Sequence, residues 1–191
     1  MGRPKACLGW GGRPLVVHQC EVLAGFAEVV VVVGHAADAL RAIPLPPPAR
    51  FVDNPAWAQG RSTTFEAGAR ALRTDPRALL VVAVDQPLDG AVVDALLAAY
   101  DPTQRGYAVP RCGERRGHPV LIGPTLWPEL RHATRHPMGL RGILGAARQE
   151  RLEVPIESPS IGWNLNTPEG YRAAVAAHDG AANGPDRPQK T

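Results

Sequence analysis

The sequence predicts an α/β fold built on a parallel, doubly wound sheet. Two apolar runs, residues 29–33 and 79–84, are too short for helices and fit strands that are buried on both faces. Helical patterns alternate with such strands over the first half of the chain, as they do in parallel sheets with helical crossovers. The 191 residues, 45% of them hydrophobic and 20% charged, are enough for one domain with a full core.

Local signals define the elements of the first half. Pro14 suits the first turn of a helix, and Gly25 is a plausible stop for it. The four prolines within residues 44–48 indicate an exposed, extended connector. Thr63 and Glu66 have the spacing of a capping box, which predicts a helix start. In chain order we expect a helix over 14–24, a strand over 29–33, a helix over 36–43, a strand over 50–53, a helix over 62–72, a strand over 79–84 and a helix over 89–100.

The second half is less regular. Thr167 as N-cap and Pro168 at the first helical position give a strong helix start. The Gly, Asn, Pro and charged residues after His178 predict a disordered tail, so that one domain covers residues 1–178 and the tail covers 179–191. The remaining expected elements are strands over 107–109 and 120–122 around the loop 111–118, a helix over 140–147 and a strand over 152–156.

Composition excludes several classes of protein. A net charge of +3 with scattered arginines does not indicate a nucleic-acid-binding protein, and a small anionic ligand is the more economical partner. The three cysteines are far apart and lack metal-site spacing, which predicts reduced thiols and a cytoplasmic protein. No apolar run is long enough to span a bilayer, so no membrane partner is expected.

Asp85 follows the apolar run 79–84, and Gln86 and Pro87 then end the strand. Open α/β sheets place their ligands at the carboxyl ends of such strands. Mg²⁺ is typically held by one or two carboxylates plus substrate phosphates, so Asp85 suffices if a second oxygen arrives from elsewhere. Asn166 can supply that oxygen. Taken alone, Asp85 can equally cap the next helix, and Asn166 can stabilise a helix N-terminus.

Three further positions can carry chemistry. Lys5 lies in a Gly- and Pro-rich segment and can meet triphosphate oxygens as a point charge, although a lysine near a terminus is usually solvated. Gly60-Arg61-Ser62-Thr63 opens a helix and forms a natural anion site; ordinary capping explains the hydroxyls but not Arg61. His118 can contact a ligand, act as a general base or merely pack, and contact is favoured over base.

Taken together, seven segments resemble the nucleotidyltransferases of molybdenum-cofactor biosynthesis (MobA-like), and most closely the molybdenum-cofactor cytidylyltransferase branch. The resemblance covers nearly the whole chain up to about Tyr171. The matching segments, in the order of the family, are Met1-Gly2-Arg3-Pro4-Lys5 with Gly11-Gly12-Arg13-Pro14-Leu15, then 29–34, Asn54-Pro55 with Gly60-Arg61-Ser62-Thr63-Thr64, Asp85-Gln86-Pro87, Arg116-Gly117-His118-Pro119-Val120, Gly139-Leu140-Arg141 and Asn166-Thr167-Pro168-Glu169.

The resemblance implies a three-layer, Rossmann-like, mostly parallel sheet of the nucleotide-diphospho-sugar transferase type. It implies Mg²⁺-dependent transfer of a nucleoside monophosphate, CMP in preference to GMP, from CTP or GTP to a molybdopterin, with release of pyrophosphate. A molybdoenzyme is then a candidate recipient of the product. By position, the resemblance implies nucleotide contacts for Gly2, Lys5 and Asp85, with Lys5 and Asp85 catalytic; metal binding by Asp85 and Asn166; and acceptor contacts for Asn54, Gly60, Arg61, Ser62, Thr63, Gln86 and His118.

The sequence departs from the family pattern in two places. The family begins with a central strand and a Leu-Ala-Ala-Gly-x-Ser-x-Arg loop, whereas Met1 corresponds to a methionine after that loop. We therefore expect an N-terminal truncation, two neighbouring strands with an unpaired edge, and weak NTP binding by a chain that starts here. Asn164 and Asn166 also stand where the branch often has Asp, and neutral amides bind Mg²⁺ more weakly than carboxylates do.

Other functions stay open at this point. One is a nucleotidyltransferase for another phosphorylated small molecule. The His118 loop is the one sequence feature that favours a pterin acceptor. Another is a non-catalytic cofactor-binding protein, which the missing loop favours but Lys5, Asp85 and Asn166 argue against. A redox enzyme on the same fold is neither supported nor excluded.

Overall fold

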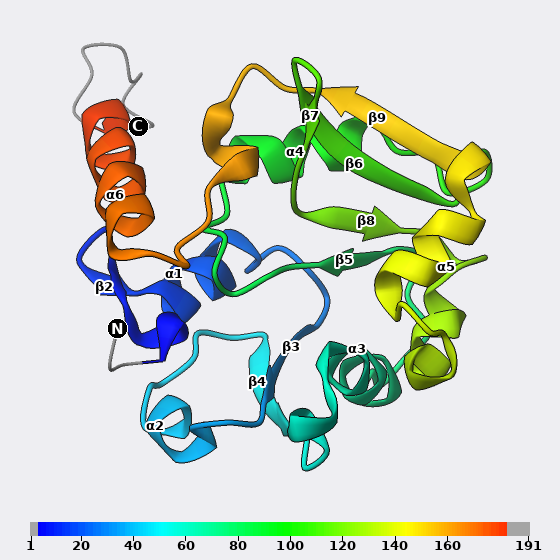
Figure 1. The fold of residues 1–191 in the computed structure, drawn as a ribbon, viewed down its shortest axis with the longest axis horizontal. Coiled ribbons are helices and arrows are strands. Elements are labelled where there is room, and N and C mark those ends of the chain that lie inside the picture. Colours follow the sequence, from blue (N-terminus) through cyan, green and yellow to red (C-terminus); the bar gives the residue numbers. More distant parts are fainter. Residues whose placement is uncertain (1–3, 183–191) are drawn as a thin grey trace.

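The structure is a computed structural model that describes residues 4–182 of the chain (Figure 1). Gly2 and residues 183–191 of the expected tail lie outside the described residues. The helices are α1 (Leu15–Val22), α2 (Ala37–Arg41), α3 (Arg61–Arg70), α4 (Gly90–Ala99), α5 (Leu140–Ala146) and α6 (Pro168–Ala182). The strands are β1 (Gly9–Trp10), β2 (Arg13–Pro14), β3 (Val29–Val33), β4 (Ala49–Asp53), β5 (Leu79–Val81), β6 (Tyr107–Cys112), β7 (Arg115–Arg116), β8 (Val120–Ile122) and β9 (Arg151–Pro155). Short 3₁₀ helices cover Lys5–Cys7, Trp57–Gln59, Trp127–Arg135, Arg148–Glu150 and Pro159–Gly162.

Apart from the short β1–β2 pair, the strands form two sheets (Figure 1). β3 and β4 pair in parallel as a two-stranded sheet. The second sheet has five strands in the order β5-β8-β6-β7, with β9 also paired to β6; β9 runs parallel to β6, and β8 runs antiparallel to both of its neighbours. Within the part of the chain that the structure describes, β3 pairs with β4 alone and β5 with β8 alone. Each of these two strands keeps one unpaired edge, as expected.

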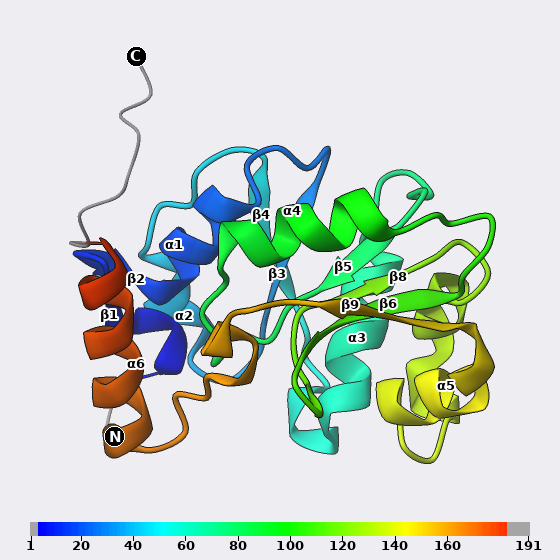
Figure 2. The same ribbon diagram turned by 90° about the horizontal axis from the view of Figure 1, so that it is seen from above.

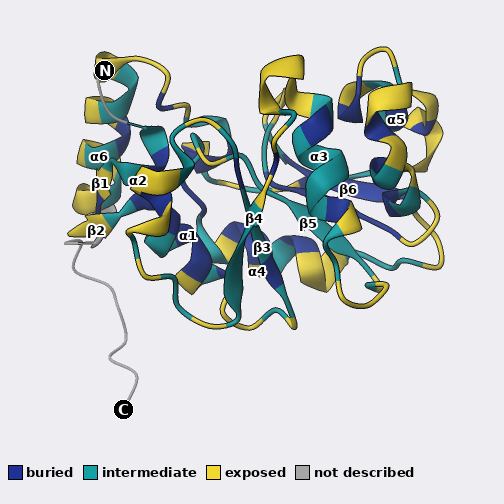
Figure 3. Cartoon of the chain, turned by 90° about the horizontal axis from the view of Figure 1, so that it is seen from below, coloured by how far each residue is buried: buried dark blue, intermediate teal, exposed yellow. Residues whose placement is uncertain are grey.

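Alternate residues of β6 and β8 face two different helix layers. Ala108 of β6 and Leu121 of β8 pack with Val92 and Leu96 of α4. The strand neighbours of Ala108 and Leu121 face the other way, toward α3 and α5, because successive side chains of a strand point to opposite faces. These neighbours are Tyr107, Val109, Val120 and Ile122. Figure 2 shows α4 on one side of the sheet and α3 and α5 on the other, and Figure 3 shows β6 as a buried strand between them. The predicted α/β class with helices on both faces is confirmed.

A further core lies between α1 and β3. Val16, Cys20 and Leu23 of α1 pack against Val29 and Val33 at the two ends of β3. The helical spacing of the α1 residues predicted this buried face. Burial raises the pKa of the Cys20 thiol to about 11, so this cysteine is a protonated core residue at neutral pH.

The strand before Asp85 is shorter than predicted. β5 ends at Val81, and residues 82–87 form an irregular segment instead of continuing to Val84. The reason lies in the partner strand, because Val120 of β8 pairs with Val81 and is preceded by Pro119, which has no N–H for a longer ladder. Apolar character alone therefore overestimated the length of this strand.

The predicted capping box at the start of α3 is wrong, although the helix is present. The helix begins after Gly60, with no side-chain cap. The Thr63 hydroxyl lies 2.8 Å from the Gly60 carbonyl oxygen and 3.1 Å from that of Ala56. Glu66 instead accepts from the backbone N–H of Thr134. These side chains connect α3 to neighbouring segments.

The last helix is longer than predicted and starts as predicted. The Gly170 N–H donates to Thr167 Oγ1 (3.0 Å), which is the expected N-cap contact at the beginning of α6. α6 continues to Ala182, beyond the predicted end at His178. No helix in the described part of the chain combines the length and the apolar character needed to cross a bilayer.

Candidate functional site

Lys5, Asp85 and Asn166, which are far apart in the sequence, meet at one point. The ammonium nitrogen of Lys5 lies 3.2 Å from Asp85 Oδ2 and also donates to Asn166 Oδ1. The Lys5 and Asp85 side chains are 35% and 21% exposed, so a ligand from solvent can reach them. The structure therefore brings together the three residues expected to bind nucleotide and metal.

Gln19 of α1 holds the backbone on both sides of Asp85. Its side-chain N–H₂ group lies 3.4, 3.3 and 3.1 Å from the carbonyl oxygens of Ala83, Val84 and Gln86. Gln19 is only 6% exposed, and a buried amide is stable where it has hydrogen-bond partners. Gln19 was not predicted from the sequence as part of the site. The available signal was a polar residue within the apolar face of a helix.

The segment that carries Asn166 is tied to the Asp85 segment through the backbone. The Leu165 N–H donates to the Asp85 carbonyl oxygen (2.9 Å), and the Leu165 side chain is fully buried beside Trp10. The Asn166 N–H donates to the side-chain oxygen of Asn164 (3.0 Å), which forms a local turn. Asn164 thus shapes this turn, while Asn166 directs its amide oxygen toward Lys5.

His118 lies beside this point, on the segment that follows the β6–β7 hairpin. Its backbone N–H donates to the Ile161 carbonyl oxygen (3.2 Å). Burial lowers the pKa of His118 below its ordinary value of 6.5; the Asp85 carboxylate opposes this shift and the Arg61 guanidinium adds to it. The imidazole is therefore neutral at pH 7.

A small cavity lies next to Asp85 and is lined by Gln86, His118 and Ser160, among others. The Gln86 side-chain oxygen and His118 Nδ1 are both buried without a protein partner. Such atoms are costly unless a water or a ligand satisfies them. Gln86 and His118 therefore offer polar groups next to the Lys5–Asp85–Asn166 point, where both were expected to contact the acceptor.

The segment before α3 is fixed by internal hydrogen bonds. The Asn54 side-chain N–H₂ group donates to Thr63 Oγ1 (2.9 Å) and Thr64 Oγ1 (3.1 Å), and both Asn54 and Thr63 are buried. These two residues hold the segment in shape. Gly60 has a φ of +115°, a conformation that suits glycine, and it leads directly into Arg61, which is exposed at the first position of α3.

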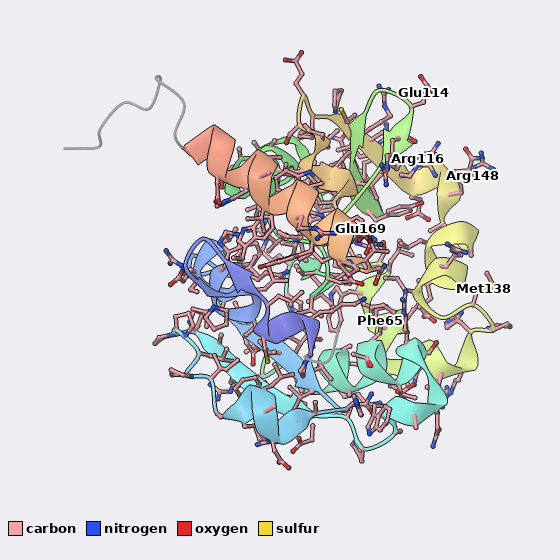
Figure 4. The ribbon with its side chains drawn as sticks, turned by 60° about the vertical axis from the view of Figure 1, so that its left-hand side comes forward. Phe65, Glu114, Arg116, Met138, Arg148 and Glu169 are labelled. Carbon is pink, nitrogen blue, oxygen red and sulfur yellow. The ribbon has the colours of Figure 1, made fainter. Side chains whose placement is uncertain are left out.

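The Met138-Gly139 turn packs on the first turn of α3. Gly139 has a φ of +53°, and a Cβ atom there would lie 2.3 Å from Ser62 Oγ. Only glycine allows this close approach. Met138, the neighbouring residue, is 59% exposed and points outward (Figure 4). Ser62, in the first turn of α3, thus packs against the segment that begins α5.

The donor atoms at the Lys5–Asp85–Asn166 point suit a hard divalent cation. Asp85 offers a carboxylate and Asn166 an amide oxygen, and Mg²⁺ and Mn²⁺ prefer oxygen ligands. Mg²⁺ is commonly held by one or two carboxylates with substrate phosphates completing its shell. Among residues 4–182, no group of three or more His, Cys, Asp or Glu side chains is placed to hold a metal. The two oxygens fit a metal that arrives with a phosphate ligand.

Comparison with known proteins identifies a family and a fold. Residues 1–152 match the MobA-like NTP transferase domain. Nicotine blue oxidoreductase of Paenarthrobacter nicotinovorans is 36% identical over 154 residues, which are 75% of this chain and 74% of that protein.

Solved structures extend the match in fold. Rv0371c of Mycobacterium tuberculosis in complex with manganese has a TM-score of 0.68 at 20% identity, covering 92% of this chain and 93% of that one. Molybdopterin-guanine dinucleotide biosynthesis protein A of Archaeoglobus fulgidus has a TM-score of 0.65 at 19% identity, covering 93% and 92%. These structures confirm the expected Rossmann-like, nucleotide-diphospho-sugar transferase type of fold.

Proposed function

This chain belongs to the MobA-like NTP transferase family and is a nucleotidyltransferase by its domain, and we propose that it transfers CMP, in preference to GMP, from an NTP to a molybdopterin. The observation that carries the proposal is the meeting of Lys5, Asp85 and Asn166 at one partly exposed point. The names of relatives give further support, since one structural neighbour is a molybdopterin-guanine dinucleotide biosynthesis protein. A molybdoenzyme would receive the product.

In the proposed reaction, a phosphate oxygen of the acceptor attacks the α-phosphorus of the NTP. A new oxygen–phosphorus bond forms, the bond between the α-phosphorus and the bridging oxygen breaks, and pyrophosphate leaves with the electron pair. Such chemistry depends on positioning and charge neutralisation more than on a protein base. The neutral imidazole of His118 agrees with a contact role.

Each residue of the site has a proposed task. Asp85 and Asn166 hold Mg²⁺, which when bound supplies neutralisation of phosphate charge. Lys5 donates hydrogen bonds to triphosphate oxygens as a point charge. Arg61, exposed at the start of α3, and His118 bind and orient the acceptor phosphate. The manganese complex of a structural neighbour supports a divalent metal in this fold.

A second candidate function is the redox activity named for the relative from Paenarthrobacter nicotinovorans. The observation that favours it is sequence identity. That protein shares 36% of aligned residues with this chain, whereas Rv0371c and the Archaeoglobus fulgidus protein share 20% and 19%. Under this alternative the chain would act on a conjugated heterocycle such as nicotine blue, and Lys5, Asp85 and Asn166 would contact a bound nucleotide without cleaving it.

One pair of assays separates the two functions. Pyrophosphate release is measured from CTP and from GTP with Mg²⁺, with and without molybdopterin. Oxidation of NADH and NADPH is measured with nicotine blue. Pyrophosphate release that requires molybdopterin and is lost in Asp85→Asn supports nucleotidyl transfer. Oxidation of the reduced nucleotide without pyrophosphate release would replace the first proposal with the second.

A further inference from the structure

Lys5 contacts the same two side chains that are proposed to bind the metal. Its ammonium reaches Asp85 Oδ2 at 3.2 Å and donates to Asn166 Oδ1. These contacts join segments that are 80 and 161 residues away from Lys5 in the sequence. The side chains of Asp85 and Asn166 thus already bind one positively charged group, the ammonium of Lys5.

We propose that Lys5 is also the resident counter-cation of the site, which holds Asp85 and Asn166 together and excludes free divalent metal until a triphosphate draws its ammonium away. This inference rests on the proposed nucleotidyl transfer and adds an order of binding to it. Metal alone binds weakly, and metal with a triphosphate binds tightly.

The competition follows from charge and from shared ligands. A divalent ion held by the Asp85 and Asn166 side chains would lie close to the Lys5 ammonium, which contacts both of them. Two positive charges at that separation repel each other strongly at a half-buried site. Asn166 has one side-chain oxygen, which already accepts from Lys5, so the ammonium and a metal would compete for it. They would also share the single negative charge of Asp85.

A triphosphate removes the conflict. The Lys5 ammonium is a compact, hydrated charge on a flexible stem, and phosphate oxygens bind it as well as a carboxylate does. When Lys5 turns to the phosphates, Asp85 and Asn166 become free for the metal. Their positions do not depend on Lys5 alone, since the Leu165 N–H to Asp85 carbonyl bond and the Gln19 amide stay in place.

The test is a Mn²⁺ titration followed by electron paramagnetic resonance, first without nucleotide. Lys5→Met removes the charge and keeps most of the side-chain length, and Lys5→Arg is the matched control that keeps the charge. The expected result is that Lys5→Met binds Mn²⁺ at least about tenfold more tightly than the unmodified chain, while Lys5→Arg does not. The double variant Lys5→Met, Asp85→Asn should lose this gain, which locates the ion. Circular dichroism checks the fold of each variant.

The second half of the titration adds a non-hydrolysable CTP analogue. We expect the analogue to tighten Mn²⁺ binding to the unmodified chain much more than to Lys5→Met, because Lys5 is no longer there to be drawn away. If Lys5→Met binds free Mn²⁺ no more tightly than the unmodified chain, including no detectable binding by either, the inference is wrong. A tighter Lys5→Met in a chain without nucleotidyl transfer would leave the inference standing and refute the proposed function.

Discussion

The backbone N–H of Leu165 donates to the carbonyl oxygen of Asp85 at 2.9 Å. Because this bond uses main-chain atoms, it joins the two halves of the proposed metal site independently of the side chains that bind the ligand. Removal of a side chain at the site should therefore change chemistry without separating the two segments.

Asp85→Asn should reduce nucleotidyl transfer by at least about a hundredfold, since it replaces the one carboxylate at the metal position. The change preserves shape, so the thermal midpoint should stay close to that of the unmodified chain. Pyrophosphate release at increasing Mg²⁺ concentration measures the effect. Asp38→Asn, the same change at an exposed position on α2, is the control and should retain full activity. Equal activities of the two variants would remove Asp85 from the site.

Gln19→Met should lower both the stability of the fold and the affinity for the metal–NTP complex. The substitution keeps the volume and removes the N–H₂ group that holds the carbonyl oxygens around Asp85, which should cost about 1–2 kcal/mol of stability. The released segment should also raise the KM for the metal–NTP complex more than it lowers kcat. Urea unfolding and steady-state kinetics measure both effects. Glu21→Gln, on the exposed side of the same helix, should change stability by less than about 1 kcal/mol. A normal KM in Gln19→Met would contradict the assigned role.

The stability of the fold should fall as the pH decreases from about 7 to about 5. Burial lowers the pKa of both His118 and His18, so below their ordinary value of 6.5 the unfolded chain binds protons that the folded chain does not. The free energy of unfolding then decreases with falling pH through the folded pKa values. His118→Gln and His18→Gln should each flatten this decrease when unfolding is measured between pH 5 and pH 8. Unchanged slopes in both variants would show that other groups control the pH dependence.

Gly139→Ala should destabilise the fold by about 1–3 kcal/mol, because a side chain is strained at its positive φ and would also collide with Ser62. The first turn of α3 should shift, which would raise the KM for the acceptor. Gly145→Ala is the matched control on the same segment. It lies in α5 with no atom near its Cβ position, and alanine there should stabilise the helix by up to about 1 kcal/mol. Thermal unfolding of both variants should therefore give shifts of opposite sign.

The sequence predicted the framework well because its strongest signals are local. Uninterrupted valines gave β3, and Thr167-Pro168 gave the start of α6. The length of β5 could not be predicted, because it depends on where Pro119 stands in the partner strand. The β1–β2 hairpin was also missed, since it depends on the positive φ values of Gly11 and Gly12, which a glycine-rich segment permits without requiring.

For the site, too, the sequence predicted individual residues, whereas the contacts between them were seen only in the structure. Topology placed Asp85 near a carboxyl end of the sheet, and the family resemblance added Lys5 and Asn166. Their direct contact required the three-dimensional structure. The sequence marked Gln19 only as a polar residue on an apolar helix face, and its contacts with the Asp85 segment join different elements. The resemblance assigned Gln86 and His118 to the acceptor, and the structure adds that both line one small cavity.

The unpaired edges of β3 and β5 have a consequence for cooperativity. Since no backbone ladder joins the two sheets within residues 4–182, the β3–β4 pair and the five-stranded sheet can behave as separate foldons with different opening free energies. Amide hydrogen exchange should then be faster in β3 and β4, a pair of strands, than in β6, which has strand partners on both sides. Ala6, next to Lys5, packs in the same core as Val29 and Val33 of β3. A ligand that binds Lys5, Asp85 and Asn166 at once should therefore slow exchange in β3 and β4 and make the two sheets unfold together.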